Sequence, residues 1–243
     1  MRKAILYIYT LLAYMVLYPF TFLIVLLILT LNTFSFKKAI PFVIRFWASS
    51  TFLIIGKTFS IEGRENLDKS RKYILMANHS SIFDIMGIMA ICPNIVWFGR
   101  ANLMDIPVFG KLLEAINFIP MKSTDLKNAK FMIEQLVRST ENKTVAIFPE
   151  GTRTTNGEMN NFRKGFLHVL KASQLELLPV SLIGFYEYKP KNRFYFDYSQ
   201  KLSAKIHAPI PYSELKNLED KEIITIVKSK IESGISLNKS KTK

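Results

Sequence analysis

The stretch "YILMANHSSIFDIMGIMAI", Tyr73 to Ile91, contains a change of pattern that decides the fold. Its first five residues are apolar and bounded by polar ones, which is typical of a short buried strand, and residues 82–91 have the composition of a helix. The polar turn between them carries His79, and Asp84 lies in the first turn of the helix. We therefore expect a strand–turn–helix unit with a histidine at its turn.

The same alternation continues along the chain. Strand patterns occur at residues 94–99, 144–149 and 175–185, and helical patterns at 108–116, 126–140, 164–173 and 220–235. Strands that alternate with helices predict an α/β domain with a largely parallel or mixed sheet flanked by helices. Residues 193–208 alternate more loosely, and we expect edge strands there.

The N-terminal part has a different composition. No charged residue occurs from Ala4 to Phe36, which is longer than the roughly 20 apolar residues that cross a bilayer. The run is also too long and bulky for a cleaved signal peptide. Pro19 interrupts it, so one kinked span and two shorter helices in one leaflet are both compatible with the sequence. We predict a membrane anchor with an interfacial helix over residues 1–57, followed by the α/β domain over 58–243.

Charge and cysteine content narrow the class of partner. The formal net charge is +14, but the basic residues are dispersed and show none of the spacings of nucleic-acid-binding motifs. An anionic membrane surface is therefore the expected partner, and nucleic acid is not. Cys92 is the only cysteine, which excludes an internal disulfide and fits a reducing compartment. The three histidines lack metal-ligand spacing, so no metal site is expected, and His168 should pack on the sheet.

His79 and Asp84 form the first candidate site. A turn between them can bring the carboxylate to one imidazole nitrogen and leave the other nitrogen facing a cleft. The carboxylate would then fix the tautomer and stabilise the imidazolium. No G-x-S-x-G elbow is present, so the expected target of this base is an external hydroxyl. The alternative is a polar turn in which His79 only fills space.

The second candidate site is "FPEGTR", residues 148–153. Gly151 permits a tight turn with exposed backbone N–H groups, and the planar fork of Arg153 suits a phosphate. The cations of "FRKG", residues 162–165, lie at the start of the next helix, where the dipole also favours an anion. The alternative is a surface loop in which Glu150 and Arg153 pair with each other. Together the two segments favour an anionic substrate.

"NHSSIFD" and "FPEGTR", placed after an apolar N-terminus, resemble the 1-acylglycerol-3-phosphate acyltransferase family over roughly residues 59–185 and the anchor. The resemblance implies that His79 deprotonates an acceptor hydroxyl, which attacks an acyl thioester, and that Asp84 orients the histidine. It also implies no cofactor, with acyl-CoA or acyl carrier protein as the donor. The residues that it assigns to the glycerol phosphate are Glu150, Gly151, Thr152 and Arg153.

One departure from that pattern concerns the phosphate. After "FIP" the family usually shows an acidic residue and an arginine, whereas this chain has Met121, Lys122 and Ser123. Lys122 is expected to supply the charge, as a point donor without the bidentate fork.

The expected function is a membrane-associated O-acyltransferase whose catalytic domain faces the cytoplasm and converts lysophosphatidic acid to phosphatidic acid. Two alternatives are an enzyme of the same fold with another lysolipid acceptor, and a non-catalytic, membrane-bound lipid carrier.

Overall fold

The centre of the fold is a mixed sheet. The computed structural model describes residues 2–116, 118–121 and 143–241, and within them the strand order is β1-β7-β6-β2-β5-β3-β4. All neighbours are parallel except β6 and β7, which confirms the expected mixed α/β sheet. The strands are β1 (Phe59–Glu62), β2 (Tyr73–Ala77), β3 (Ile95–Arg100), β4 (Ile119–Met121), β5 (Thr144–Ile147), β6 (Glu176–Ile183) and β7 (Leu202–Ile206).

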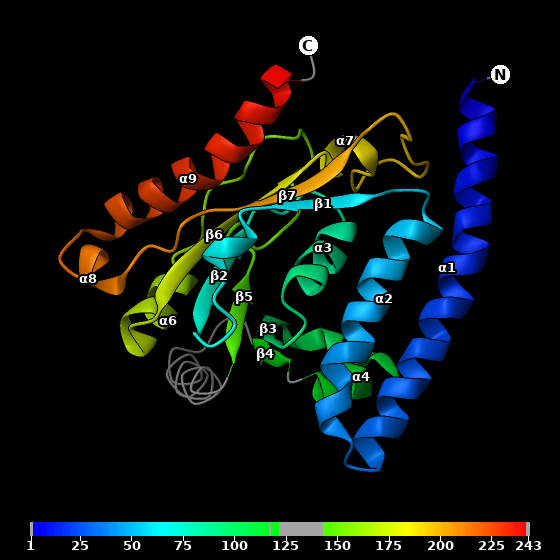
Figure 1. Ribbon diagram of the computed structural model, residues 1–243, viewed down its shortest axis with the longest axis horizontal. Coiled ribbons are helices and arrows are strands. Elements are labelled where there is room, and N and C mark those ends of the chain that lie inside the picture. The colour runs from blue at the N-terminus through cyan, green and yellow to red at the C-terminus, as the bar shows by residue number, and fades with distance from the viewer. Residues whose placement is uncertain (1, 117, 122–142, 242–243) are drawn as a thin grey trace.

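Helices cover both faces of this sheet (Figure 1). Tyr73, Leu75 and Ala77 of β2 face the core formed with α1 to α4, while Ile74 and Met76 face the core formed with α6, α8 and α9. A strand buried on both faces has to be apolar throughout, which explains "YILMA". The helices are α1 (Arg2–Thr33), α2 (Ile40–Ile54), α3 (Phe83–Ile91), α4 (Phe109–Ala115), α6 (Gly165–Ser173), α7 (Phe185–Tyr188), α8 (Tyr212–Leu215) and α9 (Asp220–Lys241).

The prediction of edge strands within residues 193–208 is wrong in part. Residues 193–201 form no strand, and β7 lies between β1 and β6, so it is not at an edge. The edge strand on this side is β1, a four-residue segment from much earlier in the chain. A pairing between such distant segments leaves no local signal. The helix expected at 126–140 lies outside the described residues.

Helix α1 lies lengthwise against the domain and beside α2 (Figure 1). It continues through Pro19 as one helix. Ala13, Leu17 and Ile28 on its inner face belong to the same core as the sheet. Thr10 Oγ1 also accepts a hydrogen bond from the main-chain N–H of Phe196 at 2.9 Å. Within the described ranges α1 alone is long and apolar enough to cross a membrane, by length and composition, but it is docked along the domain.

Helix α2 forms the layer between α1 and α3. Ile44, Ala48 and Phe52 are buried in the core. The indole N–H of Trp47 donates to Thr21 Oγ1 of α1 at 3.1 Å, which ties the two helices together. The predicted interfacial helix at 39–56 is therefore a helix, with one side in the core and Phe42 on the exposed side.

The two histidines outside the candidate site differ in their surroundings. His168 is exposed on α6, so the expectation that it packs on the sheet is wrong. His207 is buried, with its Nε2 2.8 Å from Ser181 Oγ. Burial, reinforced by Lys205 and Lys230, lowers the pKa of His207 to about 4. It is therefore neutral at pH 7 and holds β6 to the segment after β7.

Candidate active site

The structure brings His79 and Asp84 together, as the spacing predicts. His79 follows the carboxyl end of β2, and Asp84 lies in the first turn of α3. Imidazole Nδ1 is 2.9 Å from carboxylate Oδ2; the Asp84 side chain is fully buried and that of His79 is 16% exposed. A carboxylate at Nδ1 selects the tautomer in which Nδ1 carries the proton. Nε2 is then the free base.

Two main-chain groups hold Asp84 in addition to the histidine. The main-chain N–H groups of Ser80 and Ser81 donate to its Oδ2 at 2.5 and 2.7 Å. Three donors on one oxygen stabilise the charged carboxylate and fix its direction. The other oxygen, Oδ1, has no hydrogen-bond partner among the described residues. The turn therefore orients the carboxylate, which in turn orients the imidazole.

The imidazole ring also has an aromatic support. It stacks on Phe148 with ring centroids 4.0 Å apart and an interplanar angle of 12°. Phe148 stacks in turn on Trp97, at 5.4 Å. The sequence pattern assigns Phe148 no role beyond its place at the start of "FPEGTR", so this contact was not predicted. The signal available was position: Phe148 directly follows β5, which is the neighbour of β2 in the sheet.

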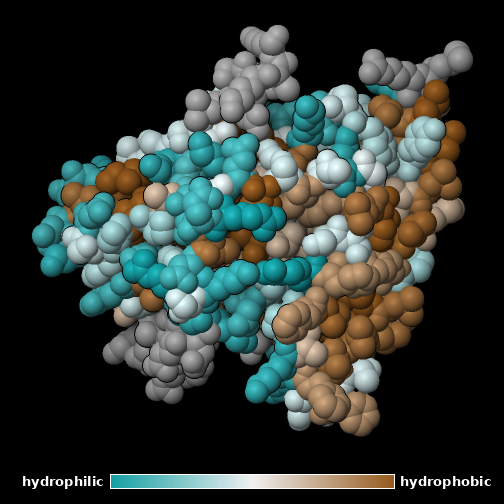
Figure 2. All heavy atoms as spheres, viewed as in Figure 1, coloured by the Kyte–Doolittle hydropathy of each residue, from teal (hydrophilic) through white to brown (hydrophobic). Residues whose placement is uncertain are grey.

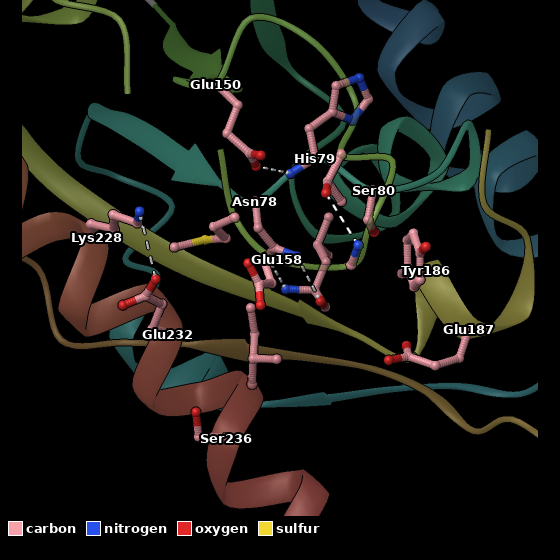
Figure 3. Close-up of a pocket in the computed structure, with 16 residues that line it drawn as sticks. Asn78, His79, Ser80, Glu150, Glu158, Tyr186, Glu187, Lys228, Glu232 and Ser236 are labelled. Atoms are coloured by element: carbon pink, nitrogen blue, oxygen red, sulfur yellow. Dashed lines mark hydrogen bonds and ion pairs between the residues drawn. The ribbon is translucent and has the colours of Figure 1, made fainter. Parts of the chain in front are cut away.

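Glu150 connects the second candidate segment to the first. One carboxylate oxygen accepts the main-chain N–H of His79 at 2.6 Å (Figure 3). The other accepts the main-chain N–H of Asn160 at 2.8 Å. The side chain is buried, and burial raises the pKa of Glu150, against the opposing effect of these two N–H donors. Glu150 is predicted to bind substrate, and in the structure each of its oxygens accepts one main-chain N–H of the protein. No ion pair joins it to Arg153 in the described structure.

The rest of the loop adjoins the turn of His79 through its main chain. Gly151 has a φ of +68°, a left-handed conformation that favours glycine. Thr152 is exposed, and Arg153 is partly buried. The main-chain N–H of Thr154 donates to the carbonyl of His79 at 2.9 Å. This bond fixes the loop against the turn between β2 and α3, residues 78–82, which is called the catalytic turn below. Lys122 lies outside the described residues.

A polar cavity of about 370 Å³ lies behind the catalytic turn. It is lined by the turn itself, the segment after Arg153, the start of α7, and Lys228 and Glu232 of α9 (Figure 3). The imidazole ring of His79 points away from α9 in this view. Across the described ranges, no group of three or more His, Cys, Asp or Glu side chains is arranged to hold a metal ion.

A histidine bonded to a buried carboxylate, with an arginine-bearing loop beside it on an α/β sheet, is an arrangement suited to group transfer. The family model described as "Acyltransferase" matches residues 58–183, and the chain belongs to this family.

Particular relatives narrow the comparison. A 1-acyl-sn-glycerol-3-phosphate acyltransferase from Cocos nucifera is 32% identical over 54% of this chain, and the human beta enzyme of that name is 30% identical over 66%. The chain spans only 43% and 58% of their respective lengths. The crystal structure of PlsC from Thermotoga maritima, titled a 1-acyl-sn-glycerophosphate (LPA) acyltransferase, superimposes with a TM-score of 0.81 at 25% identity. That match covers 98% of both chains, so the N-terminal helices are included in the similarity.

Proposed function

We propose that this protein transfers a fatty acyl group from an acyl thioester to the free hydroxyl of 1-acyl-sn-glycerol 3-phosphate, giving phosphatidic acid. The 2.9 Å contact between His79 Nδ1 and Asp84 Oδ2, with Arg153 on the adjoining loop, carries this proposal. It combines a base for a hydroxyl with a cation for a phosphate. The names of the relatives, which are 1-acyl-sn-glycerol-3-phosphate acyltransferases, support the choice of acceptor.

In the proposed reaction, Nε2 of His79 takes the proton of the acceptor hydroxyl as the oxygen attacks the thioester carbonyl. Asp84 stabilises the imidazolium that forms. When the tetrahedral intermediate collapses, the carbon–sulfur bond breaks and the imidazolium returns its proton to the leaving thiolate. The products are the new ester and a free thiol, and the histidine is again neutral. The donor is acyl-CoA or an acyl-loaded carrier protein, and no cofactor takes part.

We infer that the outer face of α1 binds the membrane that presents the acceptor. Figure 2 shows a continuous hydrophobic surface over α1 and α2, on the opposite side of the molecule from the hydrophilic surface over α9. A helix docked lengthwise on its own domain suits an orientation along the membrane surface. The net charge of +14 adds attraction to anionic headgroups, with the catalytic domain on the cytoplasmic side.

Polar substitutions on that outer face test the membrane contact without touching the core. Leu12, Met15 and Leu23 are 53%, 61% and 63% exposed. Changing all three to glutamine should lower partitioning into anionic vesicles by about a hundredfold or more, because each apolar side chain contributes at least about 1.5 kcal/mol when buried. Vesicle flotation at low lipid concentration measures this. Ile226→Gln, on the exposed side of α9, is the control and should partition like the wild type. Unchanged flotation of the triple variant would place the membrane contact elsewhere.

Arg153 discriminates between acceptors. Arg153→Ala should lower kcat/KM for lysophosphatidic acid by roughly ten- to a hundredfold, because a charged hydrogen bond contributes about 1.5–3 kcal/mol. Arg153→Lys keeps the charge without the fork and should be intermediate. For an acceptor with the same acyl chain and no phosphate, kcat/KM of the same variants should fall much less. Arg64→Ala, an exposed arginine on the 3-10 turn Arg64–Asn66, is the control. An unchanged ratio of the two efficiencies would make the loop structural.

The alternative acceptor class is a lysophospholipid or lyso-aminolipid, and the replacement of the usual arginine by Lys122 is the feature that favours it. Assay of the purified protein with a panel of lyso acceptors, each with acyl-CoA and with acyl carrier protein, separates it from the main proposal. A non-catalytic lipid carrier would show no transfer with any pair.

A further inference from the structure

The main chain of Lys189 contacts the turn that carries His79. Its main-chain carbonyl accepts the hydroxyl of Ser81 at 2.7 Å, and Ser81 also forms an isolated β-bridge with Pro190. The N–H of Ser81 is one of the donors to Asp84. Lys189 is therefore bonded to Ser81, and the N–H of Ser81 orients the carboxylate of Asp84.

Helix α7, which precedes Lys189, contacts the Arg153 loop directly. The hydroxyl of Tyr186 donates to the carbonyl of Thr155 at 2.9 Å. On the other flank, the N–H of Thr154 is bonded to the carbonyl of His79. Both segments therefore contact the turn of His79 and each other, and each carries a cation: Arg153 in one and Lys189 in the other.

Neither cation has a counter-ion within the described part of the chain. No described carboxylate forms an ion pair with Arg153 or Lys189. Lys189 is partly buried, and its ammonium has a hydrogen bond to the carbonyl of Pro190, at 3.1 Å.

Arg193 adds a third charge, but its guanidinium already donates to the main-chain carbonyls of Glu187, Tyr188 and Tyr195. The ammonium of Lys189 keeps donors for a ligand, since it has three and one carbonyl partner.

The ammonium of Lys189 is sensitive to the charges of both arginines. Burial, and then the positive charges of Arg153 and Arg193, lower the pKa of Lys189. Like charges gathered in a partly buried place raise the free energy of the unliganded protein. An anion of about two negative charges, such as a phosphate monoester, removes that cost and accepts hydrogen bonds from both free cations.

We propose that Lys189 is a second cationic anchor for the phosphate of the acceptor, acting together with Arg153. This inference rests on the proposed function, since it assigns a further binding residue to the same substrate. A guanidinium fork and an ammonium, from two segments that both contact the turn of His79, would hold the phosphate beside that turn. The ammonium of Lys189 adds to the charge expected from Lys122, which stands where the family usually has an arginine.

Binding measured without an acyl donor tests this. The probes are lysophosphatidic acid and the monoacylglycerol with the same acyl chain, titrated in detergent into the full chain. Lys189→Met should weaken lysophosphatidic acid binding about tenfold and leave monoacylglycerol binding unchanged. Lys189→Arg should stay within about threefold of the wild type. The clamp on Ser81 uses the main chain of Lys189, so these variants keep it. Lys191→Met removes an exposed charge two residues further along and should bind both probes like the wild type.

Four results would overturn the inference. Three concern the variants: equal affinities of wild type and Lys189→Met for lysophosphatidic acid, an equal loss with both probes, or an equal loss in Lys191→Met. The fourth is a wild type that binds both probes alike. The proposed function fails separately, if the wild type binds lysophosphatidic acid through Lys189 but transfers no acyl group to it.

Discussion

His79→Ala should lower kcat for acyl transfer to lysophosphatidic acid by about a thousandfold or more, because a positioned general base contributes roughly 10²–10⁴ to the rate and no other described imidazole replaces it. The fold should survive. The buried Asp84 keeps the two main-chain donors of Ser80 and Ser81 when the imidazole is removed. The loss of the Phe148 stacking contact affects a side chain that already touches solvent.

The control for this variant is His168→Ala. His168 is exposed on α6, so its removal should change neither turnover nor melting temperature. Initial rates at saturating acceptor and donor, with thermal unfolding in the same detergent, give both measurements. Near-normal turnover of His79→Ala in a folded protein would show that another group takes the hydroxyl proton.

Asp84→Asn should lower kcat by a factor of about 10²–10⁴, although it only replaces one carboxylate oxygen by an NH2 group. The N–H groups of Ser80 and Ser81 and Nδ1 of His79 all meet one oxygen, Oδ2, so the amide oxygen takes that position and the tautomer of the ring is kept. The neutral amide no longer stabilises the imidazolium that forms when Nε2 takes the proton, and this loss of charge lowers turnover.

The effect should be on turnover and not on binding. Lysophosphatidic acid should bind to Asp84→Asn with nearly the wild-type Kd, since Asp84 is buried beneath the turn. Asp220→Asn makes the same chemical change at the start of α9, where the carboxylate forms surface ion pairs with Lys171 and Lys164. Such pairs contribute about 1 kcal/mol or less, so this control should keep full activity. A parallel loss of binding and turnover in Asp84→Asn would assign Asp84 a purely structural role.

The parts of this structure that could be predicted from the sequence are those with a local cause. The unit from β2 to α3 is bounded as the pattern predicts, because a doubly buried strand and an apolar helix each leave a continuous signature. The meeting of His79 with Asp84 follows from the same unit. The approach of the Arg153 loop follows from a general property of parallel sheets, whose functional loops share one edge.

The remaining features depend on contacts between distant segments. Nothing local in "FSIE" or in residues 202–206 indicates that they pair. The inward carboxylate of Glu150 depends on Asn160 as well as on His79, and the position of Lys189 depends on Ser81. Likewise, the apolar run of α1 predicts an anchor, but its docking depends on residues near Phe196 that no reading of the run itself could identify.

That docking has a consequence for how the chain is made. Thr10 and Phe196 are separated by 186 positions. At a synthesis rate of roughly 5–20 residues per second, about 10–40 s pass between the emergence of the helix and the emergence of its docking loop. During that interval α2 is available to pack on the helix, but the outer face and the part that meets the segment near Phe196 lack a partner within the protein, which is a state prone to aggregation. The nascent chain therefore needs an apolar shelter before it can complete its core, and delivery to the bilayer during translation would provide one.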